Sequence, residues 1–312
     1  MIEFNHFPVM KEEAVEYLDV KPDGIYADMT LGGGSHTLAI AEKVEKGRGR
    51  IIAVDRDSDA IEYSREKLKE FGDMIIFAKD NYANIEEIAR SSGYGKIDGA
   101  LVDFGISSYQ IDEASRGFSY MRDGALDMRM DREQRLCAAD IINNYDKEKL
   151  RGILYNYGEE RYAELIIREI IKRRGIKRIE TTLELADIIK YAVRNRRYDG
   201  GHPAKRTFQA VRIAVNGEIE NIEPAVSSAV KLLNSGGRLV AISFHSIEDR
   251  AVKKAFAKFE KGCVCPPDFP VCVCGGKPIV RIITRKPIYP SEKEMAENSR
   301  STSAKMRVLE KL

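Results

Sequence analysis

A glycine-rich turn flanked by acidic residues is the first feature of this sequence that could do chemistry. The segment Asp28-Met-Thr-Leu-Gly-Gly-Gly-Ser-His36 follows an apolar run and leads into a helical pattern. Glycines allow the backbone to approach a ligand closely, and the helix that follows presents free N–H donors. A carboxylate at Asp28 would repel a pyrophosphate and suit a cation. S-Adenosylmethionine (AdoMet), which carries a sulfonium and an ammonium group, has the required charge.

Acids and an aromatic residue follow the next apolar runs. Asp55 ends the run that starts at Arg50, and a carboxylate there can accept hydrogen bonds from ribose hydroxyls. Tyr82 follows the third run and would border an adenine, and Asp103 ends the fourth run. This ordered set predicts an AdoMet pocket at the carboxyl edge of a sheet. A dinucleotide-dependent oxidoreductase is the weaker alternative, since Thr37 stands where the Gly-x-Gly-x-x-Gly fingerprint needs its third glycine.

Asp103 is the candidate catalytic residue. The exocyclic amine of a base is a weak nucleophile because its lone pair is delocalised into the ring. A carboxylate that accepts hydrogen bonds from this amine localises the lone pair, and alignment with the methyl donor supplies much of the acceleration. Asp103 could equally hold the methionine end of AdoMet, or cap the helix that follows. The sequence alone does not separate these roles.

The elements that must position these residues alternate between strands and helices. Apolar runs and helical patterns alternate over residues 23–103, which is typical of βαβ units and a parallel sheet. From about 108 to 205 there are helical patterns without convincing strands, and strand-like runs return at 238–243, 279–284 and 306–309. Helices are expected over 35–44, 58–71 with Ser58 as N-cap, 84–90, 138–143, 147–155, 159–173, 182–193, 207–233 with a break near Pro224, and 247–259.

The sequence therefore predicts one α/β sheet domain interrupted by an all-helical insertion. The expected boundaries are 1–109 and 206–312 for the two parts of the sheet domain, and 110–205 for the insertion. Hydrophobic residues make up 43% of the 312, enough for a sizeable core, so disorder is excluded as the main state. No run approaches the roughly 20 apolar residues of a membrane span, and no secretory signal opens the chain. We expect a cytoplasmic protein without a membrane partner.

The net charge of +2 hides a strongly basic segment. Residues 172–212 contain twelve basic and four acidic side chains, a charge of +8, which leaves −6 for the rest of the chain. Clustered Arg and Lys with nearby aromatic rings suit RNA phosphates and a stacked, extruded base, although a solvated helix face has a similar composition. His245 could equally be a structural histidine held by Glu248 or Asp249. The candidate RNA contacts are Arg194, Arg196, Arg197, His202, Lys205, Arg206 and His245.

Four of the five cysteines crowd into a Pro- and Gly-rich segment near the C-terminus. Four thiolates at this spacing suit a structural Zn²⁺ with tetrahedral geometry, whereas free thiols or a disulfide pair are the alternatives. The fifth, Cys137, is expected to be a small buried apolar residue. The candidate metal ligands are Cys263, Cys265, Cys272 and Cys274.

Several long motifs together closely resemble one family. They are Asp28–His36, Asp55–Asp57, Asp103–Gln110, Arg116–Ser119, Asp123–Asp131, Gly158–Arg161, His202–Arg212 and Ser243–Arg250. The resemblance is to the MraW/RsmH family, bacterial methyltransferases of a cytosine N4 in 16S ribosomal RNA, and it extends from about residue 6 to residue 308.

The resemblance implies a class I AdoMet-dependent methyltransferase (Rossmann-like) domain with a helical insertion for substrate recognition. It also implies AdoMet as the methyl donor and a decoding-centre cytidine of 16S ribosomal RNA, in the small ribosomal subunit, as the acceptor. Ser35 replaces a glycine that is common in the family, but a small hydroxyl residue still allows backbone contact. A non-catalytic RNA-binding ribosome assembly factor is the alternative. The implied AdoMet contacts are Gly34, Ser35, His36, Asp55, Tyr82, Asp103 and Gln110.

Overall fold

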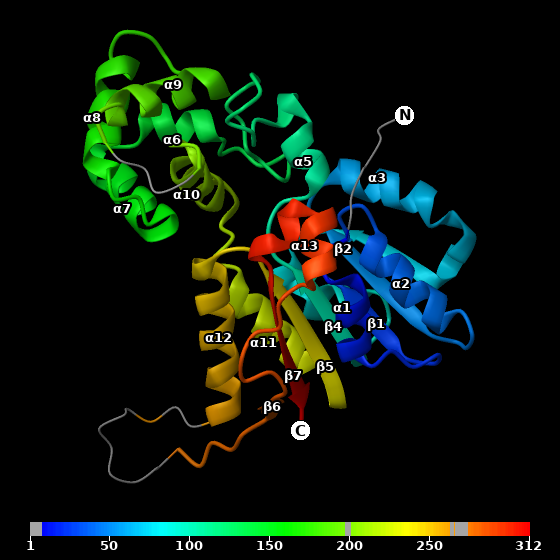
Figure 1. Cartoon of the computed structure of the whole chain (residues 1–312). Helices are drawn as coiled ribbons and strands as arrows, with labels where there is room; N and C mark the ends of the chain where they lie inside the picture. Colours follow the sequence, from blue (N-terminus) through cyan, green and yellow to red (C-terminus); the bar gives the residue numbers. More distant parts are fainter. Residues whose placement is uncertain (1–7, 197–200, 263–264, 266–273) are drawn as a thin grey trace. The chain divides into compact units, whose positions relative to one another are not determined.

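The computed structural model describes residues 8–196, 201–262, 265 and 274–312 (Figure 1). The chain forms two compact units. The sheet unit consists of Met1–Gly105 and Ile219–Leu312, and the helical unit consists of Ile106–Glu218. Among the described residues, none of the helices combines the length and apolar character that crossing a membrane requires.

A seven-stranded sheet in the order β3-β2-β1-β4-β5-β7-β6 forms the centre of the sheet unit. The first five strands in this order are parallel, and β7 pairs antiparallel with both β5 and β6. This arrangement confirms the predicted α/β fold. The strands are β1 (Ile25–Asp28), β2 (Arg50–Asp55), β3 (Ile75–Lys79), β4 (Ile97–Asp103), β5 (Leu233–Ser243), β6 (Val280–Ile282) and β7 (Lys305–Lys311).

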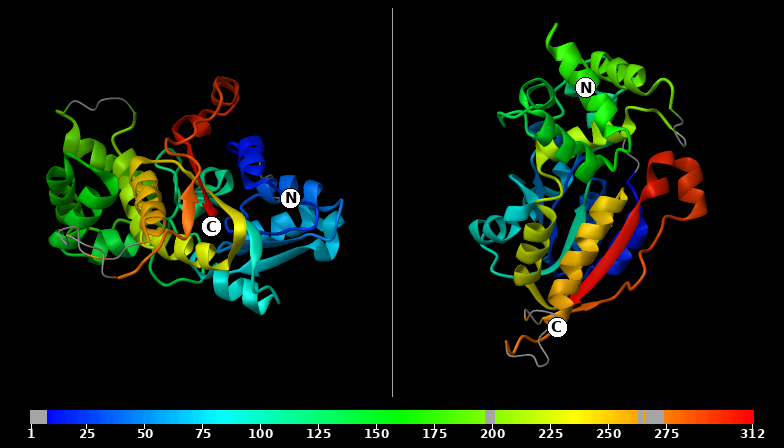
Figure 2. Two further views of the ribbon diagram at one scale, coloured as in Figure 1. Left: turned by 90° about the horizontal axis from the view of Figure 1, so that it is seen from below. Right: turned by 90° about the vertical axis from the view of Figure 1, so that its left-hand side faces the viewer.

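Helices cover both faces of this sheet (Figures 1 and 2). Ile51 of β2 packs on the face covered by the first three helices, and its neighbour Ile52 packs on the opposite face. Successive side chains of a strand point to opposite faces, so a strand covered on both sides is apolar throughout. One face carries α1 (Lys11–Leu18), α2 (Ser35–Val44) and α3 (Ser58–Lys67), and the other carries α4 (Ile85–Ser91), α11 (Ile222–Leu232) and α12 (Ser246–Lys261).

The strand order places the candidate acids at one edge of the sheet. Asp28, Asp55 and Asp103 are the last residues of β1, β2 and β4, which run parallel. The strand order reverses between β1 and β4, and ligands of open α/β sheets bind outside the carboxyl ends of the strands at such a reversal. Asp28 and Asp103 lie at this reversal.

The helical unit has a hydrophobic core of its own. Ile166 and Ile170 of α8, Ile189 of α9 and Val211 of α10 belong to one buried cluster within it. Its helices are α5 (Ser108–Asp112), α6 (Ala138–Asn144), α7 (Lys147–Gly158), α8 (Ala163–Arg174), α9 (Thr182–Val193) and α10 (Lys205–Asn216).

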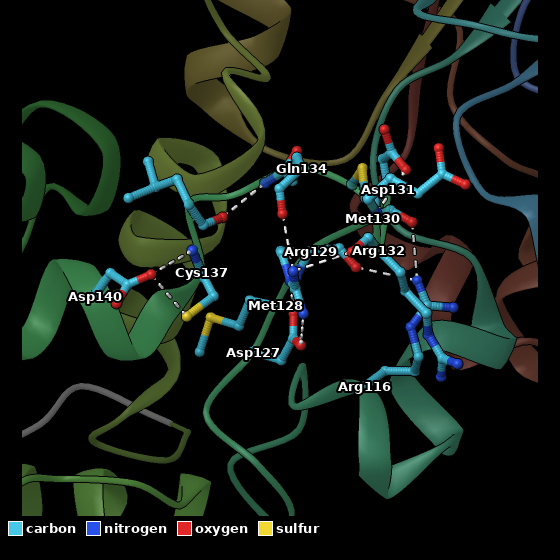
Figure 3. Close-up of polar contacts among 12 residues, drawn as sticks. Arg116, Asp127, Met128, Arg129, Met130, Asp131, Arg132, Gln134, Cys137 and Asp140 are labelled. Atoms are coloured by element: carbon cyan, nitrogen blue, oxygen red, sulfur yellow. Dashed lines mark hydrogen bonds and ion pairs between the residues drawn. The ribbon is translucent and has the colours of Figure 1, made fainter.

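Buried polar side chains hold the irregular segment between α5 and α6 (Figure 3). One guanidinium nitrogen of Arg116 donates to the carbonyl oxygens of Arg129, at 3.0 Å, and Met130, at 2.9 Å. The side chain of Asn216 accepts from the Met130 N–H, at 2.9 Å, and donates to the Met128 carbonyl, at 2.8 Å. Met128 has a φ of 60°, so these bonds hold a backbone conformation that costs an L-residue free energy.

The second boundary of the insertion lies later than the expected 205/206. Helix α10 begins at Lys205 and packs against α7, so residues 206–218 belong to the helical unit. The first boundary lies at 105/106 rather than at 109/110. Helical periodicity alone does not tell which core an amphipathic helix joins, and this is why the second boundary was misplaced.

Three details of the expected helices were wrong. The helix expected over 207–233 is two helices that separate at Gly217, which has a φ of 60°. Pro224 instead lies in the first turn of α11, where its missing N–H removes no intrahelical bond.

The N-cap of α3 is Asp57 and not the expected Ser58. The side chain of Asp57 caps α3 by accepting from the Asp59 N–H at 3.1 Å. Glu159, with a φ of 46°, ends α7, so α8 begins only at Ala163.

Candidate functional site

The glycine turn after β1 adopts a backbone that only glycine takes easily. Gly32 and Gly34 have φ values of 48° and 71°, and a Cβ on Gly34 would lie 3.0 Å from the Ser64 hydroxyl oxygen. The Ser64 hydroxyl donates to the Gly32 carbonyl at 2.8 Å, and Lys67 Nζ donates to the Gly33 carbonyl at 2.8 Å. These two hydrogen bonds from α3 therefore hold the backbone of the glycine turn in its compact conformation.

Asp55 is tied to this turn. Its Oδ2 accepts from the Gly32 N–H at 2.7 Å, and its Oδ1 accepts from the Asp57 N–H at 2.9 Å. Burial raises the pKa of Asp55 to about 6. Two carboxylate oxygens offer about four acceptor positions, so capacity remains for the ribose hydroxyls that the sequence pattern predicts.

Asp28 is fully buried beside the same turn. Its Oδ2 accepts from the Thr37 hydroxyl at 2.6 Å, and its Oδ1 accepts from the Thr30 N–H at 3.1 Å. Burial raises the pKa of Asp28 to about 6. Thr37, which interrupts the dinucleotide fingerprint, is therefore a direct partner of this acid, a role that sequence spacing did not indicate.

Asp103 is the least satisfied of the three acids. Its Oδ1 is buried and has no hydrogen-bond partner among the described residues, and its N–H donates to the Thr30 hydroxyl at 2.7 Å. Burial, followed by the negative charges of Asp28 and Glu248, raises the pKa of Asp103 well above its usual value. A carboxylate in this position gains from a cationic or hydrogen-bond-donating ligand.

Tyr82 lies where the sequence places an adenine contact, just after β3. It begins a 3₁₀ turn, Tyr82–Asn84, and the Asn81 side chain caps this turn by accepting from the Ala83 N–H at 3.0 Å. The Tyr82 and Phe104 rings form a T-shaped pair, with the two centroids 5.6 Å apart and the planes 75° apart. This contact fixes an aromatic surface next to the carboxyl edge of the sheet.

The side chains of Ser35 and His36 have structural partners. Nε2 of His36 donates to the Val9 carbonyl at 3.1 Å, and burial lowers the pKa of His36 to about 4, so the ring is neutral. The Ser35 hydroxyl oxygen accepts from Lys67 Nζ at 3.2 Å. The backbone of the first turn of α2 is therefore what these two residues offer a ligand.

Gln110 belongs to the helical unit, where it stabilises the start of α5. Its Oε1 accepts from the Ser107 N–H at 3.2 Å, and its own N–H donates to the Ser107 hydroxyl at 3.2 Å. This reciprocal pair is a capping box. The AdoMet contact that the resemblance implies for Gln110 stays a prediction.

His245 caps the start of α12 through one of its ring nitrogens. Its Nδ1 accepts from the Glu248 N–H at 3.2 Å, and its Nε2 lies 3.0 Å from Oε1 of Glu248. The other carboxylate oxygen of Glu248 accepts from the Phe244 N–H at 2.8 Å. The Nδ1 bond caps the start of α12, whereas Nε2 has no hydrogen-bond partner among the described residues, so the structural role and the RNA contact of His245 both stay predictions.

Acids from outside the basic segment neutralise part of its charge. The helices of the unit bring these acids next to the segment. A charge sum over residues 172–212 alone therefore leaves them out. The pairs are Arg173 with Glu169 at 2.8 Å, Arg178 with Asp140 at 3.4 Å, and Arg212 with Glu218 at 2.7 Å. Two more pairs form within the segment, Lys177 with Glu184 at 2.8 Å and Lys190 with Asp187 at 3.3 Å.

Apart from Lys172 at the end of α8, the exposed cations outside these ion pairs lie where α9 ends and α10 begins. Arg194 stacks on the Tyr191 ring, 4.0 Å from its centroid, and Arg196 and Lys205 are exposed. Arg206 donates to the Glu159 carbonyl at 2.8 Å. The His202 ring stacks on Tyr120, with the centroids 4.6 Å apart. Arg197 lies outside the described residues.

Two of the predicted zinc ligands, Cys263 and Cys272, lie outside the described residues. The described part of the chain, which includes Cys265 and Cys274, holds no cluster of three or more metal-ligating side chains. Zinc therefore stays a prediction. Cys137 differs from expectation because it is only half-buried and its Sγ donates to the Asp140 carboxylate at 3.2 Å.

A family model described as the MraW methylase family matches residues 3–312. The chain belongs to this family. Its sheet unit accordingly has the class I AdoMet-dependent methyltransferase fold, which is Rossmann-like, and the chain is a methyltransferase. Membership in the MraW family also confirms the resemblance seen in the motifs.

Curated relatives span the whole chain. The chain is 49% identical over 311 residues to the ribosomal RNA small subunit methyltransferase H of Clostridium botulinum (strain 657 / Type Ba4), covering 100% of both chains. It is 48% identical over 313 residues to the protein of the same name from Finegoldia magna, again covering 100% of both. A third such relative, from Brevibacillus brevis, is 48% identical over 312 residues and covers 100% of this chain and 99% of its own.

Proposed function

We propose that this chain transfers a methyl group from AdoMet to the N4 amine of a cytidine in the decoding centre of 16S ribosomal RNA, within the small ribosomal subunit of the cytoplasm. Family membership and the names of the full-length relatives support a ribosomal RNA substrate. The observation that carries the chemistry is Asp103, whose buried Oδ1 has no partner among the described residues at the end of β4.

The residues of the carboxyl edge fit AdoMet. Burial raises the pKa values of Asp28 and Asp103, so the positive charge of a sulfonium or ammonium group would stabilise their carboxylates, whereas Asp55 would accept from the ribose hydroxyls. The compact turn around Gly34 allows the backbone to approach the ligand, and Tyr82 offers a ring for the adenine. AdoMet, when bound, supplies the electrophilic methyl group.

Asp103 would accept hydrogen bonds from the target amine and localise its lone pair for in-line attack. This role needs an acceptor oxygen that no protein donor occupies, and Oδ1 meets this requirement among the described residues. Asp28 and Glu248 would keep the surroundings negative, which favours a cationic donor over a pyrophosphate. Backbone N–H groups around Ser35 and His36 are the proposed contacts at the other end of AdoMet.

The deciding experiment is labelled-methyl transfer to unmethylated small ribosomal subunits and to naked 16S ribosomal RNA, with the modified nucleoside identified by mass. We expect N4-methylcytidine. Transfer to carbon, to ribose, or to nothing would overturn the proposal. Transfer to nothing, with intact RNA binding, would favour the assembly-factor alternative. Calorimetry with AdoMet and with NAD separates the methyltransferase from the oxidoreductase.

We further propose that the exposed cations between α9 and α10 contact RNA phosphates. Reversing Arg194 and Arg196 to Glu is expected to weaken RNA binding about ten-fold or more and to leave AdoMet affinity unchanged, because phosphate contacts add roughly independently. Filter binding over a salt series measures both the affinity and its slope. The matched control is the double reversal of Lys253 and Lys254 to Glu, two exposed residues of α12. Equal losses in both double variants would show that only net charge matters.

The cysteine segment is proposed to hold one structural zinc through Cys263, Cys265, Cys272 and Cys274. Four thiolates suit zinc, and their loss would release it. Metal analysis of protein purified without added zinc is expected to find about one equivalent per chain. Replacing Cys265 and Cys274 with Ser should remove it. Less than about a tenth of an equivalent in the unaltered protein contradicts this proposal.

A further inference from the structure

The first turn of α10, in the helical unit, has backbone donors that no side chain caps. Ala204 occupies the cap position and cannot accept from the turn. The Lys205 N–H donates to the His202 carbonyl at 3.0 Å, and the Phe208 N–H makes the first bond within the helix, to the Ala204 carbonyl at 2.9 Å, so the Arg206 and Thr207 amides are the donors that the turn offers. A helix leaves the N–H groups of its first turn without partners inside the helix, and its dipole favours negative charge there. A helix start alone does not make a site, so the side chains around it decide.

Thr207 adds an unsatisfied hydroxyl to this turn. It is the third residue of α10, it is fully buried, and its Oγ1 has no hydrogen-bond partner within the described ranges. The Cα–Cβ bonds of a helix tilt towards its N-terminus, so the Thr207 side chain extends over the first turn of α10. Buried hydroxyls almost always have a partner in native proteins, so this one calls for a ligand or an ordered water.

His202 supplies a further donor of defined tautomer. Its Nδ1 accepts from the Ala204 N–H at 3.2 Å, so in the neutral ring the proton is on Nε2. Stacking on Tyr120 holds the ring, with the two planes 15° apart, and Phe208 meets Tyr120 edge-on at 5.6 Å. The ring therefore presents a fixed N–H next to the first turn of α10.

We propose that the first turn of α10 binds a phosphodiester group of the RNA, with the Thr207 hydroxyl, His202 Nε2 and the Arg206 and Thr207 amides as donors. This inference rests on the proposed function and assigns one RNA contact within it. Lys205 and Arg206 add positive charge at the same turn, and the bond from Arg206 to the Glu159 carbonyl holds that guanidinium beside it. AdoMet has no phosphate, so RNA is the reactant that can occupy this site.

Thr207→Val tests the hydroxyl with little change of shape. Because the hydroxyl is unsatisfied in the free protein, the variant is expected to keep or raise the melting temperature. Its affinity for unmethylated small subunits is expected to fall about five- to ten-fold, with AdoMet affinity unchanged. Thr207→Ser, which keeps the hydroxyl, is expected to restore most of the affinity. If the hydroxyl has no role in RNA binding, Thr207→Val should again keep or raise the melting temperature, but its RNA affinity should not change.

His202→Phe is the second variant, since it keeps the stacking on Tyr120 and removes the N–H. An affinity loss of about five-fold or more supports the site, and the logarithmic salt slope should stay unchanged because the neutral ring releases no counterion on binding. If both variants bind small subunits with the affinity of the unaltered protein, the inference is overturned. If Thr207→Val does not fold, the affinity of His202→Phe alone decides whether the site binds RNA. Failure of the proposed function is distinguishable, because then the unaltered protein itself yields no N4-methylcytidine.

Discussion

Asp103→Asn is expected to reduce methyl transfer by at least about 10²-fold while leaving the ligand-free protein at least as stable. The amide has the same shape as the carboxylate but accepts hydrogen bonds less strongly and carries no charge. If Asp103 acts on the base, AdoMet affinity is retained and the single-turnover rate falls. If Asp103 holds the methionine end of AdoMet, affinity falls as well. Calorimetry and single-turnover kinetics on small subunits measure the two separately.

The stability change in Asp103→Asn has a predictable pH dependence. The pKa of Asp103 is raised in the folded protein, so its stabilising effect is present at low pH and is lost as the pH rises through the folded pKa. The variant and the unaltered protein should therefore unfold with similar free energies near pH 4, and the variant should be the more stable at higher pH. Denaturant unfolding without AdoMet at several pH values measures the difference.

Asp98→Asn is the matched control, at the opposite end of the same strand. Its carboxylate accepts from the Ile25 N–H and from the Asn234 side chain, both at 2.8 Å, so its role is structural. We expect this variant to lose stability and to keep its AdoMet affinity and methyl-transfer rate. An Asp103→Asn protein that methylates at the normal rate would remove Asp103 from the chemistry.

Arg116→Met is expected to destabilise the helical unit by about 3 kcal/mol. The Arg116 side chain is only 2% exposed, and its bonds to the Arg129 and Met130 carbonyls would have no replacement. The strained backbone at Met128 depends on the same segment staying in place (Figure 3). Thermal unfolding should show a lowered transition for this unit.

Two measurements decide this prediction. AdoMet affinity, for which Gln110 is the one contact that we predict from the helical unit, should be nearly normal in Arg116→Met at temperatures below the lowered transition. Arg132→Met removes an exposed arginine from the same segment, and its effect should stay within about 0.5 kcal/mol. Equal stability of the two variants would mean that the Arg116 bonds do not hold the segment.

The sheet and the acids at its edge were predictable because their signals are local. A strand that is buried on both faces is apolar throughout, so the charged residues at its two ends mark its bounds. The run Arg50–Asp55 is such a strand, and β2 has these same bounds. The helix Ser35–Val44 was likewise bounded correctly by its glycine turn. Parallel pairing then brings Asp28, Asp55 and Asp103 to one edge without further information.

Partners that are distant in the sequence were not predictable. No local pattern shows that His36 donates to the Val9 carbonyl, that Thr37 donates to Asp28, or that Glu248 faces both nitrogens of His245. The same limit applies to charge, since Glu169 and Asp140 neutralise arginines of a segment that they do not belong to. Such contacts arise from packing, which a sequence window does not contain.

The chain passes from the sheet unit to the helical unit at 105/106 and returns at 218/219, and this arrangement has an evolutionary consequence. Without residues 106–218, the chain would run from β4 through α11 to β5, which is an ordinary crossover between adjacent parallel strands. The catalytic scaffold is thus topologically complete without its insertion. A lineage could lengthen, replace or delete this module in a single genetic event and keep every strand in order, so the RNA contacts that we propose for the module can change without altering the sheet.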